Sequence, residues 1–174
     1  GSVGAFTNKI LPFVEEVVDY FNISSDATRV GVATFASSAV VNFNLDSYST
    51  KASVIDAIRA VEYPGGGTYT SEGLAAVRTN LFSEANGMRP LQSGVSRVLV
   101  VLTDGQANAG YEPDYEAGLL KDLGVNIFSI GVGQGVNENE LDTMASNPLS
   151  TYVPSLALVL ALALSLSCVR ALSP

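Results

Sequence analysis

Three oxygen-bearing side chains stand at positions where they could bind a metal ion: Ser2, Thr68 and Asp104. Asp104 follows the apolar run 97–102 and precedes a glycine, where a carboxylate can act as a hard oxygen ligand or simply cap a turn. Thr68 follows three glycines and opens a segment of helical spacing, so its hydroxyl could cap a helix or bind a cation. Ser2 precedes the first helical segment and has the same two interpretations.

The composition excludes several kinds of catalytic or metal site. The chain has 174 residues with no histidine and one cysteine, which rules out His-based relays, His-ligated zinc, thiolate clusters and an internal disulfide. Its net charge of −8 would repel a phosphate backbone, so we expect no nucleic-acid partner. With 47% hydrophobic and 15% charged residues, the chain should fold, either as a binding module or as a metal-assisted enzyme.

Helical and strand patterns alternate along the chain. Apolar residues recur at helical spacing in 6–21, 50–61, 68–81, 115–123 and 138–144, and Pro12 should kink the first helix or mark an irregular first turn. Buried-strand patterns occupy 28–35, 39–45, 97–102 and 125–132, with a hairpin expected between the first two. This order predicts a parallel sheet with helices on both faces, whose ligands bind beyond the carboxyl ends of the strands. Asp104 stands at such an end.

Five motifs then carry a resemblance to a known family. They are Gly-Ser-Val-Gly at 1–4, Arg-Val-Gly-Val-Ala-Thr-Phe-Ala at 29–36, Gly-Gly-Thr-Tyr-Thr at 66–70, Val-Val-Leu-Thr-Asp-Gly at 100–105 and Ile-Phe-Ser-Ile-Gly-Val-Gly at 127–133. In this order, over residues 1–153, they resemble a von Willebrand factor type A domain. The resemblance implies an α/β, Rossmann-like open sheet, mostly parallel and flanked by helices, with a metal-ion-dependent adhesion site for Mg²⁺ or Mn²⁺. It assigns Ser2, Thr68 and Asp104 as metal ligands.

Part of the family pattern has no counterpart in the chain. The adhesion-site loop of the family reads Asp-x-Ser-x-Ser, and Ser2 matches only its last serine. The strand before that loop is also missing; the resemblance places it centrally, between 28–35 and 97–102. Without it, two buried strand edges would keep unpaired backbone groups at about 1–3 kcal/mol each. We therefore interpret the domain as incomplete at its N-terminus and expect Mg²⁺ or Mn²⁺ to bind this chain weakly or not at all.

The expected function is that of an extracellular adhesion or matrix-binding module whose cation binds an acidic group of a protein partner, with no catalytic residues. Asn22 begins an Asn-Ile-Ser glycosylation sequon, which fits a secreted protein. One alternative is a structural interaction domain that needs no metal. Another is a metal-dependent α/β enzyme, which would need a second carboxylate near Asp104. Glu72, near Thr68, and Glu112, near Asp104, are the candidates for it, and both have the pattern of solvated positions.

Residues 154–174 form an apolar tail that departs from the family pattern. A helix over 156–169 would measure about 21 Å, short of the roughly 30 Å that a membrane span needs. The tail could instead be a glycosylphosphatidylinositol signal that anchors the chain at the cell surface, an apolar helix docked on the sheet, or an aberrant splice or reading-frame product. Cys168, in this tail, has no partner cysteine in the chain.

Overall fold

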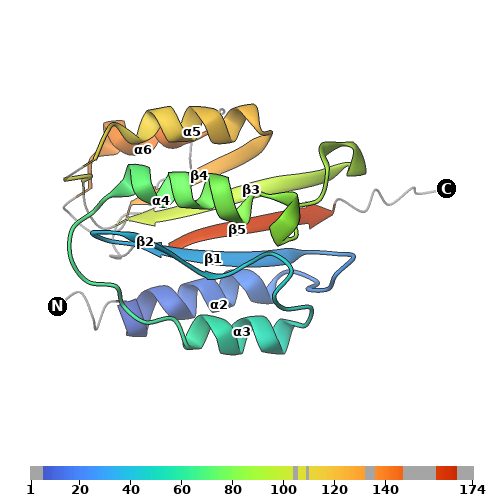
Figure 1. The fold of residues 1–174 in the computed structure, drawn as a ribbon. Helices are drawn as coiled ribbons and strands as arrows, with labels where there is room; N and C mark the ends of the chain where they lie inside the picture. The colour runs from blue at the N-terminus through green and yellow to red at the C-terminus, as the bar shows by residue number, and fades with distance from the viewer. Residues whose placement is uncertain (1–5, 104–105, 109, 132–135, 147–159, 168–174) are drawn as a thin grey trace.

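Five strands form one sheet in the order β2–β1–β5–β3–β4 (Figure 1). The computed structural model describes residues 6–103, 106–108, 110–131, 136–146 and 160–167. The strands are β1 (Arg29–Phe35), β2 (Ala39–Phe43), β3 (Val95–Thr103), β4 (Val125–Gly131) and β5 (Leu160–Ser167). The helices are α2 (Leu11–Asp19), α3 (Lys51–Arg59), α4 (Thr70–Ala76), α5 (Pro113–Asp122) and α6 (Glu138–Met144), with short turns at η1 (Phe6–Ile10), η2 (Val77–Leu81), η3 (Glu84–Asn86) and η4 (Leu91–Ser93).

Strands β1, β3 and β4 run in the same direction. β3 and β4 pair in parallel, and β1 and β3 are both antiparallel to β5, which makes them parallel to each other. The predicted hairpin is confirmed, because β1 and β2 pair antiparallel. The carboxyl ends of β1, β3 and β4 therefore lie at one edge of the sheet, at the left in Figure 1.

The central strand β5 comes from the apolar tail. Leu164 pairs with Val30 of β1 on one side and with Val98 of β3 on the other. β5 therefore fills the position that the missing strand of the family pattern would leave open, and the docked helix was wrong for residues 160–167. The physical reason is that two buried strand edges need backbone partners. The segment reads Leu-Ala-Leu-Ala-Leu-Ser-Leu-Ser, an alternation with the period of two typical of a strand.

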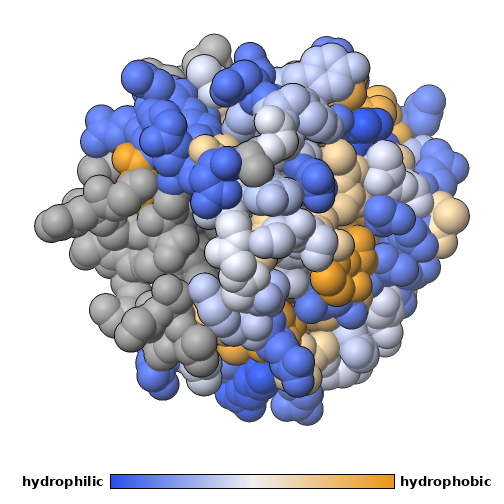
Figure 2. All heavy atoms as spheres, turned by 60° about the vertical axis from the view of Figure 1, so that its left-hand side comes forward, coloured by the Kyte–Doolittle hydropathy of each residue, from blue (hydrophilic) through white to orange (hydrophobic). Residues whose placement is uncertain are grey.

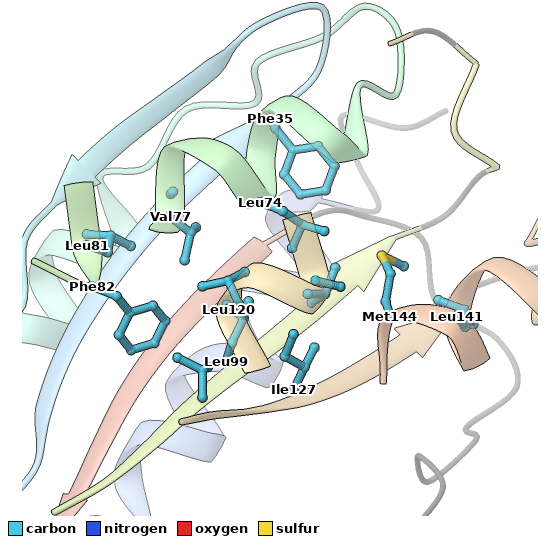
Figure 3. Close-up of a cluster of buried hydrophobic side chains, with 14 of the residues drawn as sticks. Phe35, Leu74, Val77, Leu81, Phe82, Leu99, Leu120, Ile127, Leu141 and Met144 are labelled. Carbon is cyan, nitrogen blue, oxygen red and sulfur yellow. The ribbon is translucent and has the colours of Figure 1, made fainter. Parts of the chain in front are cut away.

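Helices cover both faces of the sheet. α2 and α3 lie on one face, and α4, α5 and α6 lie on the other (Figure 1). On the second face, buried side chains from α4, η2, α5 and α6 pack against those of β1, β3 and β4 (Figure 3). The helices contribute Leu74, Leu120 and Met144, and the strands contribute Phe35, Leu99 and Ile127. None of the helices among the described residues is long and apolar enough to cross a membrane.

Local signals in the sequence set several helix ends. Pro12 lies in the first turn of α2, directly after the π-helical turn η1, so the predicted irregular start is confirmed. Thr50 caps α3, where its side chain accepts a 3.2 Å hydrogen bond from the Ser53 N–H. α4 begins at Thr70, two residues later than the spacing predicts, which leaves Thr68 in the preceding loop.

The position of β5 can be tested through its backbone. Leu164→Pro removes an N–H from the middle of the sheet and should cost at least about 1–3 kcal/mol. Hydrogen-exchange mass spectrometry should then show faster exchange in the peptides that cover β1 and β3. Leu164→Ala keeps the N–H and serves as the control for the lost side chain. Unchanged protection of both strands in Leu164→Pro would contradict the pairing.

Candidate functional site

The candidate site lies at the sheet edge where β1, β3 and β4 end. β3 ends at Thr103, directly before Asp104 in sequence. Asp104 and Ser2 lie outside the described residues, so their predicted meeting with Thr68 stays a prediction. Figure 2 turns this edge toward the viewer, and the described residues there are mostly hydrophilic. The structure describes Thr68 and the segments that hold it.

The glycine-rich loop before Thr68 is bound to the turn between β1 and β2. The Gly67 N–H donates to Ser37 Oγ at 2.9 Å, and the Tyr69 N–H donates to the Ala36 carbonyl at 2.9 Å. Gly66 has a φ of 110°, and a Cβ placed on it would lie 2.6 Å from Ser37 Oγ. A larger residue at this position would therefore strain the backbone and clash with Ser37. The absence of a side chain on Gly66 therefore lets this loop lie close to the turn between β1 and β2.

Thr68 is fixed from its other side by Asn108, which belongs to the segment that follows β3. The Thr68 N–H donates to Asn108 Oδ1 at 3.0 Å, and the Asn108 N–H donates to the Thr68 carbonyl at 3.1 Å. The capping interpretation of Thr68 was wrong, because the N-cap of α4 is Tyr69. Within the described residues, no hydrogen bond uses Thr68 Oγ1.

Glu140 of α6 joins two parts of this edge. Its Oε2 accepts the Ala107 N–H at 2.9 Å, and its Oε1 accepts the buried Thr70 hydroxyl at 3.4 Å. Burial raises the pKa of Glu140, an effect that these two hydrogen bonds only partly offset, and the negative charge of Glu112 raises it further. Glu140 therefore ties the segment after β3 to the start of α4.

Sequence reasoning missed both Asn108 and Glu140. Asn108 lies in a polar stretch without any recognisable pattern of residue spacing that would mark it as functional. Glu140 lies in a short acidic helix. Glu72 and Glu112, the two acids named as candidates for a second carboxylate, are exposed as predicted. The carboxylate that reaches the segment after β3 thus comes from α6, more than 30 residues farther along the chain.

The donor chemistry at this edge fits a hard cation. The Thr68 hydroxyl is an oxygen donor of the type that Mg²⁺ accepts, it is half-buried, and its backbone is held on both sides. Among the described residues, no three Asp, Glu or Cys side chains converge to form a metal cluster. A cation site here would therefore depend on hydroxyl groups and few carboxylates, with Asp104 as the predicted carboxylate.

Comparison with known proteins adds a family match. The family model for the von Willebrand factor type A domain matches residues 1–159. The chain is 38% identical to matrilin-4 of Mus musculus over 141 residues, which are 81% of this chain and 22% of that protein. It is 34% identical to the transmembrane cell adhesion receptor mua-3 of Caenorhabditis elegans over 150 residues, which are 85% of this chain and 4% of that protein. The chain thus spans less than a quarter of the length of these curated relatives.

A solved structure with the same fold carries a metal. It is proximal thread matrix protein 1 from the mussel byssus, described with a zinc-occupied MIDAS motif. The match has a TM-score of 0.79 and 31% sequence identity, and it covers 86% of this chain and 39% of that one.

The link between Thr68 and Asn108 can be tested by substitution. Asn108→Ala removes the side-chain acceptor of the Thr68 N–H and should cost about 1 kcal/mol locally. Amide exchange at Thr68, measured by NMR, should become about fivefold faster. Asn139→Ala, an exposed position in α6 whose side chain makes no hydrogen bond within the described residues, is the control. Equal Thr68 exchange in Asn108→Ala and the unsubstituted chain would contradict this role.

Proposed function

The chain belongs to the von Willebrand factor type A family, and on that premise we propose that it binds an acidic group of a protein partner through a divalent cation. The proposed ligands are Ser2, Thr68 and Asp104, and the proposed cation is Mg²⁺ or Mn²⁺. The single observation that carries the proposal is the placement of Thr68. Its loop is fixed at the carboxyl edge of the sheet by Ser37 and Asn108, and no hydrogen bond among the described residues uses its hydroxyl.

The chemistry follows from the type and number of the ligands. A hard cation held by two hydroxyls and one carboxylate would keep a positive charge and open positions, which could attract a carboxylate from a partner. The described residues contribute by holding Thr68 beside the segment that follows β3. They do so through the two hydrogen bonds between Thr68 and Asn108. With only one carboxylate, we expect the cation to bind weakly.

The domain is extracellular and of the adhesion and matrix type, and its relatives include matrilin-4 and a transmembrane cell adhesion receptor. We propose a matrix or cell-surface protein as its partner and no catalytic role. The identity of these two relatives, a matrilin and an adhesion receptor, supports a binding role. A metal-independent interaction domain is the second candidate, favoured by the lack of an acidic cluster among the described residues.

Removal of Asp104 tests the cation site. Mn²⁺ bound beside Thr68 should broaden the NMR signal of the Thr68 amide at low Mn²⁺ concentration. Asp104→Ala removes the one proposed carboxylate, so the Mn²⁺ affinity should fall by at least about tenfold, the lower limit typical of changes around metal ligands. Asp142→Ala, which removes an exposed carboxylate from α6, should leave the affinity unchanged. Absence of any Mn²⁺ effect at Thr68 in the unsubstituted chain would favour the metal-independent module.

We also propose that Asn22 carries an N-linked glycan. The residue is exposed and lies just after α2, and its carbonyl accepts the Thr28 N–H at 3.0 Å, so the sequon stands on an ordered turn. After secretion from a eukaryotic host, the chain should lose mass on treatment with peptide N-glycosidase. Asn22→Gln should abolish this loss, and Asn139→Gln, outside any sequon, should retain it. A secreted chain of unmodified mass would refute the assignment.

A further inference from the structure

A polar pocket of about 400 Å³ opens beside the Thr68 edge. It lies between the segment that follows β3 and the N-terminal ends of α5 and α6. Asn108, which holds Thr68, forms part of its wall, so the pocket adjoins the proposed cation site. Its lining combines polar side chains with Ala107, Gly110 and Pro113; the side chains used below are Tyr111, Glu112, Asn139 and Glu140.

The pocket has an excess of negative charge. Glu112 and Glu140 line it, and none of its described lining residues is a lysine or an arginine. The N-terminus of α5 supplies about half a positive charge, while the first N–H groups of α6 are already bonded to Asn137 Oδ1. One cation lies close by, because the Lys121 ammonium donates to the carbonyl of the lining residue Thr143 at 3.0 Å. Burial raises the pKa of Glu140, and the negative charge of Glu112 raises it further.

Behind one lining residue, Gly110, lies a buried hydroxyl without a hydrogen bond in the part of the chain that the structure describes. Ser71 is fully buried, and its Oγ makes no hydrogen bond within the described part of the chain. It faces Gly110, which lines the pocket: a Cβ placed on Gly110 would lie 2.5 Å from Ser71 Oγ. Ser71 itself does not line the pocket, so it is no part of the surface that a ligand would contact.

Tyr111 gives the pocket an aromatic wall in a fixed position. Its hydroxyl donates to the buried carboxylate of Glu116 at 2.7 Å, and Glu116 is also bound to Arg78 at 2.6 Å. The hydrogen bond to Glu116, with burial, raises the pKa of Tyr111 to about 12, so the phenol stays protonated and keeps this bond at neutral pH. The ring is 48% exposed, and an aromatic face beside carboxylates suits a planar cation.

We propose that this pocket binds the guanidinium group of an arginine from a protein partner. Guanidinium offers a single positive charge, five donors for carboxylate and amide oxygens, and a plane that stacks on an aromatic ring. Such a partner would present an arginine next to the acidic group that the cation binds. That pairing rests on the proposed function, whereas the arginine pocket itself needs no metal.

The test titrates the full chain with N-acetyl-arginine amide in EDTA and follows amide shifts by NMR. Shifts should appear at Asn108, Tyr111 and Asn139. The citrulline analogue has nearly the same shape without the charge, and it should bind about five- to tenfold more weakly. Equal binding of the two analogues, or no shifts at these residues, would overturn the proposal. Because EDTA removes divalent cations, failure of the metal site leaves this result unaffected.

A charge-removing variant localises the binding. Glu112→Gln should weaken the arginine analogue about three- to fivefold, in line with the loss of one partly exposed charge pair. Glu112 makes no side-chain cap to α5, so this substitution should leave the fold intact. Glu138→Gln makes the same change at an exposed position in the first turn of α6, outside the pocket, and should bind like the unsubstituted chain. Unchanged affinity in Glu112→Gln would assign the binding elsewhere and refute the pocket.

Discussion

The structure depends on the need of buried strands for backbone partners. β1 and β3 both lie in the interior of the sheet, and each would carry a row of unpaired N–H and C=O groups if nothing stood between them. β5 satisfies both rows, with Leu164 paired to Val30 and to Val98. Only when this position is filled can helices pack on two continuous faces and hold the carboxyl ends of β1, β3 and β4 at one edge.

The candidate site is held mainly by hydrogen bonds around Thr68. The β1–β2 turn holds the glycine loop through Ser37, the segment after β3 holds Thr68 through Asn108, and α6 holds that segment through Glu140. Three connections between segments that are distant in sequence therefore fix Thr68, the residue before it and the segment that binds it. A partly exposed loop fixed in this way can present a hydroxyl at a defined position without being buried itself.

Negative charge is the chemical property that characterises this edge. The chain is acidic overall, with a net charge of −8, and Glu112 and Glu140 concentrate negative charge beside Thr68. An edge with this charge favours cations of two kinds: a metal ion on hard oxygen ligands and a guanidinium in the neighbouring pocket. The two proposals are complementary, since the metal would attract an acidic group of the partner while the pocket receives a basic one.

The sequence by itself determined the alternation of strands and helices, the hairpin of β1 and β2, the irregular start at Pro12 and the family, because each rests on local spacing or a short motif. Only the tertiary structure decided that residues 160–167 form the central strand, that Asn108 rather than a helix end fixes Thr68, and that Glu140 and Glu112 share a pocket. The physical reason is that strand pairing and hydrogen bonds between loops join residues far apart in the chain, and local patterns hold no information about which partners will meet.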